Sequence, residues 1–303
     1  MTDLLGPYLW VLVTVLAALG QSLRSLIQKN ARVDLGVYGS AFVRFLYGLP
    51  ISFLLLLFVV GWSKLLTVEI HSVFVFWVVL ASCVQILFTI FLGLAFESRN
   101  FITSIALSKT DAVQAAFFEI LLLSFVPDLN LVIAISIGFC AIFFIGQSVP
   151  SGDIGRRRFS GTSVSLGLLA GLCLGSCSVF YRIAMEALSG LNIIEGAMLT
   201  ASVAVLIQTI IMGIALRIWR PTELVACLRS WRLSSVAGTI AAVTTVLWFI
   251  AFSIMGVAQV RMLGQIEVVF SLLFSVLFFK EKVHRLELLG ACLISLSLVV
   301  LVF

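Results

Sequence analysis

Ten long apolar runs, separated by short polar clusters, constrain this 303-residue chain more than any other feature of its sequence. One helix that crosses a bilayer core needs about 20 consecutive, mostly apolar residues. Runs of this length recur from end to end, so the sequence predicts an all-α polytopic membrane protein with ten transmembrane helices. The predicted spans are 6–28, 37–61, 72–96, 100–125, 129–148, 162–186, 191–216, 233–254, 257–279 and 285–303.

The composition excludes the other classes of protein. Hydrophobic residues make up 62% of the chain and charged residues 11%, whereas soluble domains average about 45–50% and about 25%. Six cysteines in 303 residues are too few for a disulfide scaffold. The net charge of +5 is spread over loops, so no nucleic-acid partner is expected. The partner that this composition predicts is the lipid bilayer.

A polar stretch at 149–161 divides the chain near its midpoint. We therefore expect helices one to five in residues 1–148, a connecting loop at 149–161, and helices six to ten in residues 162–303. Shifting the second half by 156 positions places Glu267 on Asp111 without a gap in the surrounding segment. Five is an odd number, so duplicated halves would enter the membrane in opposite orientations. The expected architecture is thus an inverted repeat, a design that holds its substrate near the midplane of the membrane.

Loop charges predict the orientation, because Lys and Arg gather in cytoplasmic loops. The loops after spans one, three, five, seven and nine hold thirteen of these residues, and the opposite side has only Lys64 and Arg261. The odd-numbered loops are therefore expected in the cytoplasm, and both termini are expected to face outward. The short loops and the absence of a targeting extension favour a multi-pass protein of a bacterial inner membrane.

Seven charged residues are expected inside the hydrocarbon core of the membrane, where each costs about 2.5 to 3.5 kcal/mol at a helix centre. Such residues face a bundle interior or a water-filled cavity, and they mark functional sites or pair with one another. Four are basic and three are acidic: Arg24, Arg44, Lys109 and Arg182, and Asp111, Glu119 and Glu267.

Polar residues also recur at helical spacing, so three spans each present one polar stripe. The stripes are Gln21, Arg24 and Gln28 on the first helix, Asp111 and Gln114 on the fourth, and Glu267 and Ser271 on the ninth. Stripes on repeat-related helices predict a central cavity that binds a polar solute. The candidate cavity residues are Gln21, Arg24, Arg44, Lys109, Asp111, Gln114, Tyr181, Arg182, Trp248, Glu267 and Ser271.

Two further interpretations concern the same charges. Arg24 or Arg44 can instead form structural ion pairs with Asp111 or Glu267 and hold the two halves in register. Asp111 and Glu267 are also the candidates for proton coupling, because a carboxylate in a low-dielectric site can bind and release a proton near neutral pH. Neutralisation of these carboxylates by a nearby arginine would counteract proton coupling.

Motifs of enzymes and ATP-driven pumps are absent from the sequence. It contains no HExxH, no GxSxG, no GxxxxGK[ST] and no dinucleotide fingerprint. Cys173 and Cys177 lie one helical turn apart but lack the His or acidic neighbours of a metal site. We therefore expect no enzymatic activity, no metal and no cofactor.

Small residues and a proline predict how some helices pack. Gly167, Gly171 and Gly175 on the sixth span permit close helix approach. Packing within the monomer is the favoured role of these glycines over dimerisation. The expected oligomeric state is a monomer or a homodimer. Pro50 removes one backbone hydrogen bond and predicts a kink in the second span.

The stretch from Gln265 to Leu296, QIEVVFSLLFSVLFFKEKVHRLELLGACLISL, resembles the EamA family of the drug/metabolite transporter superfamily. Glu267, Glu281 and Gly290 fill the acidic position, the Glu-containing turn and the Leu-Leu-Gly start of the last helix. Asp111 fills the acidic position of the first repeat. Further similar segments are FVRF around Arg44 and Tyr181-Arg182 at the end of the sixth helix.

The sequence also departs from the family's pattern. Pro127-Asp128 replaces the Glu-containing turn in the first half, and Lys109 is unusual within the fourth helix. The loop charges further oppose the cytoplasmic termini that are usual in ten-helix relatives.

The resemblance implies a secondary transporter that works by alternating access, with two five-helix EamA repeats. The candidate cavity mixes both signs, four basic residues against three acidic ones, which favours a small polar metabolite, amino-acid-like or anionic, over a hydrophobic cation, with protons as a candidate coupling partner. In this interpretation Arg24, Arg44 and Lys109 hold an anion or pair internally, and Tyr181 and Trp248 shape the cavity. The alternatives are a proton-coupled drug exporter of broad specificity and a non-transporting membrane protein.

Overall fold

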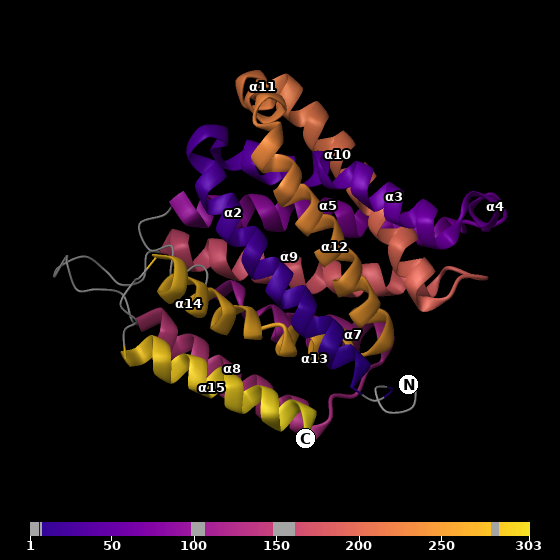
Figure 1. The fold of residues 1–303 in the computed structure, drawn as a ribbon. Coiled ribbons are helices and arrows are strands. Elements are labelled where there is room, and N and C mark those ends of the chain that lie inside the picture. The colour runs from indigo at the N-terminus through magenta and orange to yellow at the C-terminus, as the bar shows by residue number, and fades with distance from the viewer. Residues whose placement is uncertain (1–5, 7, 98–106, 148–160, 280–284) are drawn as a thin grey trace. The chain divides into compact units, whose positions relative to one another are not determined.

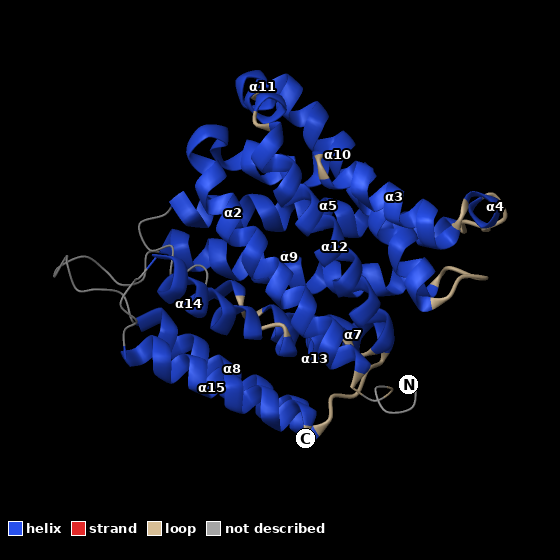
Figure 2. Ribbon diagram, in the orientation of Figure 1, coloured by secondary structure: helices blue, strands red, loops and turns tan. Residues whose placement is uncertain are grey.

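The structure is a computed structural model that describes residue 6 and residues 8–97, 107–147, 161–279 and 285–303. All regular secondary structure in these ranges is helical (Figure 2). Seven stretches are long and apolar enough to cross a membrane, so the chain is a multi-pass membrane protein. They are Leu35–Val60, Ser72–Ala95, Val164–Glu186, Ile193–Trp219, Ser234–Ile254, Val257–Phe274 and Arg285–Val302.

Most of the predicted spans have a helix at the expected place. The seven stretches coincide with seven of them, and the shorter apolar helices Leu9–Ser25 and Leu129–Ile145 coincide with two more. Of the remaining span, 100–125, residues 100–106 lie outside the described residues. The predicted connecting loop at 149–161, with its three arginines, also lies almost entirely outside them.

The chain divides into two compact units, and each takes helices from both halves of the sequence. Unit 1 comprises Met1–Ile86 and Cys177–Gly256, and unit 2 comprises Leu87–Ser176 and Val257–Phe303. The helices that lie wholly in unit 1 are α2 (Leu9–Leu46), α3 (Gly48–Val60), α4 (Trp62–Leu65), α10 (Ile193–Trp219), α11 (Pro221–Arg229) and α12 (Trp231–Ile254). Those of unit 2 are α7 (Asp111–Leu123), α8 (Leu129–Gln147), α13 (Val257–Leu263), α14 (Ile266–Phe279) and α15 (Arg285–Val302). Two helices contribute residues to both units: α5 (Ser72–Glu97) and α9 (Gly161–Glu186).

In unit 1, α2 packs along α12, and α3 packs on α10 (Figure 1). Small residues permit the approach of α2 to α12, because a methyl group added at Gly20 would meet the Thr244 side chain. The predicted kink at Pro50 is a helix break: α2 ends at Leu46, and α3 begins at Gly48. Pro50 has no N–H to donate to the Leu46 carbonyl, which explains the position of the break.

Two polar segments that were predicted as loops are helical. The expected loop between the first two spans is helical up to Leu35, and Gly36, with φ 69° and ψ −179°, separates the two helical stretches that the label α2 covers. Glycine adopts such positive φ values without a steric penalty. The polar segment 217–232 contains α11, which has Pro221 in its first turn, a position where the missing N–H costs nothing.

In unit 2, α8 packs along α15, and α7 packs on α13 (Figure 1). Gly290 of α15 is buried, and a side chain there would collide with Ile145 of α8. Gly138 of α8 likewise lies beneath Met262 of α13. The Leu-Leu-Gly segment that the sequence singled out therefore supplies the small residue of this helix contact.

Two of the predicted spans, 100–125 and 257–279, contain an interruption. A turn at Gly264–Gln265 separates α13 from α14, and a turn at Lys109–Thr110 precedes α7. The shift of 156 positions that aligns the two sequence halves places these turns within one residue of each other. The amide of Gln265 donates a hydrogen bond to the Lys109 carbonyl oxygen at 3.3 Å, so the two interruptions lie against each other within unit 2.

The glycines of α9 face the beginning of α7, as expected for packing within one chain. A methyl group added at Gly175 would lie 2.7 Å from the Asp111 carbonyl oxygen and 2.9 Å from the Ala115 nitrogen. Gly171 similarly faces backbone and side-chain atoms of residues 108–114.

Gly175→Ala is therefore expected to lower the free energy of unfolding by about 2 kcal/mol, because the clashing atoms belong to backbone that cannot rotate away. Gly196→Ala is the matched control, since its added methyl group would meet only Leu188 at 3.9 Å. Alanine favours a helix interior over glycine by about 1 kcal/mol, so this control should not destabilise. Unfolding in detergent micelles measures both variants, and equal stabilities would contradict the proposed close contact.

Candidate functional site

Buried arginines line an enclosed cavity in unit 1. Arg24 and Arg44, both on α2, are only 9% and 7% exposed. The cavity is small, about 10 Å³, which is room for about one water molecule, and its walls come from α2, α5, α10 and α12. The lining residues are Arg24, Arg44, Phe45, Gln85, Val205, Gln208, Ala241, Ala242 and Thr245.

Neither arginine has an acidic partner in the described part of the chain, where five ion pairs involve other residues. The Arg24 Nε atom is buried and makes no hydrogen bond there. The two guanidinium groups lie close enough to repel each other. A buried, uncompensated charge is costly, and this cavity contains two of them.

A hydrogen-bond network supports the two amide side chains of the cavity. The Tyr181 hydroxyl donates to Gln85 Oε1 at 2.8 Å, and Gln208 Nε2 donates to the same oxygen at 2.5 Å. Gln208 Nε2 also lies 3.1 Å from the Tyr181 hydroxyl, and Ser82 lies 3.3 Å from it. Tyr181, which is 1% exposed, therefore positions Gln85 and Gln208 and does not line the cavity itself.

Charged residues of unit 2 form two ion pairs at the helix interruptions. Arg261 Nε donates to Asp111 Oδ2 at 2.6 Å, and both residues are buried. Lys109 pairs with Glu267. Asp111 and Glu267 lie in the first turns of α7 and α14, and Arg261 lies in the last turn of α13. All three charges therefore complement the dipoles of their helices.

These pairs differ from the predicted ones. The sequence suggested Arg24 or Arg44 as the partner of Asp111 or Glu267, whereas the structure pairs the two carboxylates with Arg261 and Lys109. Arg261 was counted among the basic residues of the outer side, although it falls within the predicted span 257–279, and it is a buried residue of α13. Its position within that span was the signal that it could pair with a buried carboxylate.

Glu119 caps the first residues of α13. Its two carboxylate oxygens accept hydrogen bonds from the backbone N–H groups of Val257 at 2.7 Å and Ala258 at 2.8 Å. Glu119 is 1% exposed. A helix that begins inside a membrane leaves its first N–H groups without partners in the chain, and this carboxylate supplies two acceptors.

The remaining predicted residues lie in different places. Arg182 pairs with Glu186 at 2.9 Å and donates to the Met255 carbonyl oxygen at 3.0 Å, where α12 ends. Trp248 is buried beside Phe252, and Gln21 is half-buried, but neither lines the cavity.

In unit 2, Gln114 is partly buried beside Gly171, and Ser271 is exposed, so the predicted stripe from Glu267 to Ser271 does not continue inward. The side chain of Gln28 lies outside the described residues.

Two residues of the cavity were missed by the sequence analysis. Gln85 and Gln208 are single amides in otherwise apolar spans, and Gln208 is 1% exposed. An isolated amide in a spanning helix is a weaker signal than a charge. Both became visible as site residues only when the packing placed them beside Arg44.

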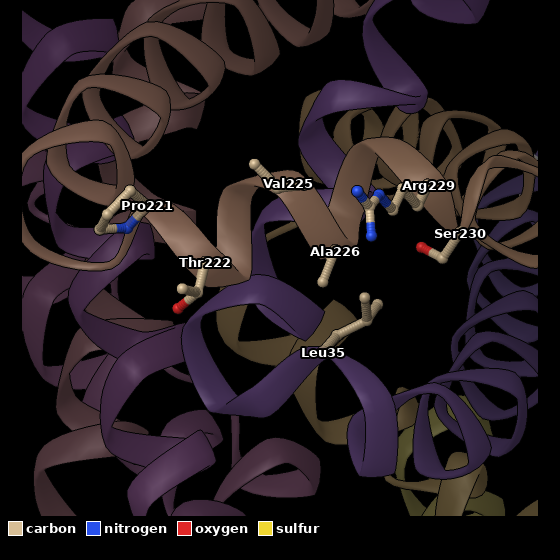
Figure 3. Close-up of a pocket in the computed structure, with 7 residues that line it drawn as sticks. All are labelled: Leu35, Pro221, Thr222, Val225, Ala226, Arg229 and Ser230. Atoms are coloured by element: carbon tan, nitrogen blue, oxygen red, sulfur yellow. The ribbon is translucent and has the colours of Figure 1, made fainter.

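An open pocket lies between α2 and α11, away from the arginine cavity but in the same unit (Figure 3). In Figure 3, Leu35 of α2 and Ala226 of α11 point toward each other across it. Glu223 of α11 accepts a hydrogen bond from the Gly39 N–H at 2.9 Å, just after the positive-φ residue Gly36. This contact ties α11 to the non-helical point of α2.

Cys227 of α11 is expected to be unreactive toward maleimides at neutral pH. Burial and the nearby Glu223 carboxylate raise the pKa of its thiol to about 11. The reactive thiolate at pH 8 should then be on the order of 100-fold scarcer than for a thiol with the usual pKa of about 8.5.

Variants that carry a single cysteine test this expectation. The rate for Cys227 should rise about tenfold per pH unit from pH 8 to 10, whereas Arg229→Cys, on the exposed side of the same helix, should level off near pH 9. Equal rates at pH 8 would contradict the prediction.

The long apolar helices, with charges buried among them, define a multi-pass integral membrane protein. Residues 161–303 match the EamA-like transporter family, so this part of the chain is an EamA-like transporter domain. The predicted resemblance is thereby confirmed for the second half. No curated protein matches the chain.

Solved structures share the fold. One crystal structure of a protein superposes with a TM-score of 0.71 over 96% of this chain and 95% of its own, at 12% sequence identity. At this identity the similarity concerns the fold alone.

Proposed function

We propose that the protein is a secondary active transporter that moves a small polar metabolite across the membrane by alternating access. The observation that carries the proposal is the small polar cavity of unit 1, where Arg24 and Arg44 are buried among spanning helices without an acidic partner in the described part of the chain. Charged side chains among spanning helices are costly, and those without a pairing partner mark substrate or ion pathways. The EamA-like domain at residues 161–303 supports transport, and the members of this family are typically not enzymes.

We further propose ten spanning helices in two inverted five-helix repeats, residues 1–148 and 162–303. The interruptions before Asp111 and Glu267 support this arrangement, because they fall within one residue of positions that the 156-residue shift relates. Paired, interrupted helices are typical of transporters that are built from inverted repeats.

In this account, Asp111 and Glu267 stabilise unit 2 through their ion pairs with Arg261 and Lys109. Uptake of a proton by Asp111 would leave Arg261 without its counter-ion, and the same holds for Glu267 and Lys109. Proton coupling through either carboxylate would therefore require the pair to open first. The basic cavity also disfavours a hydrophobic cation as substrate, which argues against the drug exporter.

The proposed orientation, with both termini outward, gains support from Arg261. With this residue buried in α13, Lys64 is the one basic residue left of the two that the loop charges placed on the outer side. An alkaline phosphatase fusion after Phe303 should be active in a bacterial inner membrane. Activity of a cytoplasmic reporter at that position would contradict the orientation.

Uptake into proteoliposomes tests the function. Vesicles that contain the purified protein should accumulate one chemical group of labelled solutes from a panel of amino acids, dicarboxylates, phosphate esters and organic cations. We expect saturable uptake of a polar solute and none by protein-free vesicles. Uptake of organic cations alone would favour the drug exporter, and no uptake of any solute would contradict transport.

A further inference from the structure

We propose that the open pocket between α2 and α11 binds an anionic phospholipid, with Arg229 against the lipid phosphate and the apolar lining against the first carbons of the acyl chains. The pocket lies in unit 1 and shares no lining residue with the small cavity at Arg24 and Arg44. The inference therefore does not depend on which solute the protein transports.

The pocket lies at the level of the membrane surface, because three spanning stretches of unit 1 have their ends around it. The stretch Leu35–Val60 begins at a residue that lines the pocket, and α11 connects the end of Ile193–Trp219 to the start of Ser234–Ile254. Trp219 and Trp231 flank α11 and are 75% and 57% exposed. Tryptophan is enriched at the headgroup level of a bilayer, so this pocket is placed where lipid headgroups lie.

Helix α11 has the character of a helix that lies along a membrane surface. One side packs on α2, where Cys227 is buried and its thiol donates to the Gly39 carbonyl oxygen at 3.4 Å. Val225 and Leu228, on another side, are 47% and 56% exposed. Exposed apolar residues on a helix that also carries basic residues are typical of helices at the interface between lipid and water.

The charge around the pocket is complementary to an anionic lipid. The segment 217–232 contains four arginines and one acidic residue, which gives it a net charge of +3. The acidic residue is Glu223, and its carboxylate already accepts a hydrogen bond from the Gly39 N–H at 2.9 Å. Arg229 lines the pocket and forms no ion pair in the described part of the chain.

The orientation predicted from the loop charges places this segment on the cytoplasmic side. Basic pockets between spanning helices on that side bind the headgroups of anionic lipids. A guanidinium group presents a planar fork of donors that matches phosphate oxygens. We therefore assign the lipid phosphate to Arg229.

The rest of the lining matches the apolar part of a phospholipid. In Figure 3, Ala226 lies between Thr222 and Arg229 along α11 and points toward Leu35. Apart from Thr222, Arg229 and Ser230, the lining residues are apolar: Leu35, Pro221, Val225 and Ala226. A soluble phosphate would leave this apolar surface in contact with water, whereas the acyl chains of a lipid would cover it.

The size and openness of the pocket also fit a lipid. Its volume of about 680 Å³ lies within the range of about 300–1,000 Å³ that is typical of small-molecule pockets. This is room for a headgroup and the beginning of the acyl chains. Val225 lines the pocket and is half-exposed, so the remainder of the chains can leave along the apolar surface of α11.

Thermal unfolding of the purified full-length protein in a neutral detergent tests the inference. The probes are phosphatidylglycerol, phosphatidylcholine with identical acyl chains, and free glycerol phosphate. We expect phosphatidylglycerol to raise the Tm by several degrees and to saturate, because it binds the folded protein alone. Phosphatidylcholine at the same mole fraction should raise the Tm much less, and glycerol phosphate should not raise it.

Variants separate the pocket from basic residues elsewhere in the segment. Arg229→Gln should weaken binding of phosphatidylglycerol about tenfold, as expected for the loss of one charged hydrogen bond. Arg229 is exposed and has no ion pair among the described residues, so this variant should unfold like the unmodified protein when no lipid is added. Arg217→Gln is the matched control, because Arg217 is an exposed arginine of the same segment that does not line the pocket. It should weaken binding less than about twofold, since salt screens exposed charges that do not contact the ligand.

Filling the pocket gives a second readout. Ala226→Phe should remove most of the shift with phosphatidylglycerol, because the ring would occupy the space that Ala226 borders. Leu228→Phe is the control, since Leu228 is an exposed residue of the same helix outside the lining. It should leave the shift unchanged.

Equal shifts with the two lipids would overturn the inference, and so would a shift with phosphatidylglycerol that survives both Arg229→Gln and Ala226→Phe. A full shift with glycerol phosphate alone would show a site for a soluble phosphate and would also overturn it. Each of these results would leave the proposed transport function standing, because uptake into proteoliposomes tests that function separately.

Discussion

Asp111→Asn is expected to lower the free energy of unfolding by about 3 to 5 kcal/mol, because it leaves the buried Arg261 without its counter-ion. Removing one partner of a buried ion pair costs more than removing both. The double variant Asp111→Asn/Arg261→Gln should therefore recover a large part of the loss. The measurement is unfolding in mixed micelles, analysed as a double-mutant cycle.

Asp128→Asn provides the control for this prediction. Asp128 is exposed and accepts a hydrogen bond from the Leu131 N–H at 3.1 Å at the start of α8, a role that asparagine fills equally well. This variant should unfold like the unmodified protein. Additive losses in the double variant of Asp111 and Arg261 would contradict the coupling.

The second large effect is expected at Glu119. Glu119→Gln should lower the free energy of unfolding by about 2 kcal/mol and Glu119→Ala by about 4 kcal/mol, because the first leaves one N–H of α13 unpaired and the second leaves both. The negative charge at the beginning of a helix adds to the loss. Unfolding in mixed micelles measures the two variants side by side.

Glu186→Gln is the matched control for Glu119, since it removes a carboxylate that is 51% exposed and paired with Arg182 four residues away. Exposed pairs of this kind contribute less than about 1 kcal/mol. A loss at Glu119 no greater than that at Glu186 would show that the capping of α13 does not stabilise the protein.

The helices of this protein were largely predictable because a bilayer demands long apolar runs. The errors fall where polar residues continue a helix. Helix α2 runs through the polar segment before Leu35, and α11 lies in a segment that was read as a loop. Polarity indicates contact with water or headgroups, and it does not by itself end a helix. The interruption at Gly264–Gln265 depends on packing in unit 2, which no local pattern records.

The charged residues of the candidate site were predictable from the sequence, and the residues that contact them were not. Arg24 and Arg44 were identified because charges in apolar runs are rare and costly. Their neighbours Gln85 and Gln208 come from other helices, and only the tertiary packing brings the four residues together. The partner of Asp111 was missed for a related reason: Arg261 lies near the start of its span, and its depth in the protein depends on how α13 packs on α7.

Exchange of a labelled polar solute by proteoliposomes tests the central claim most directly. Vesicles are loaded with the unlabelled form of the solute that the uptake panel identifies, and entry of the labelled form is compared between the unmodified protein and Arg24→Gln/Arg44→Gln. The account predicts saturable exchange by the unmodified protein and its loss in the double variant, with the folded fraction unchanged. Exchange by the double variant at the unmodified rate would contradict a transport site at these two arginines.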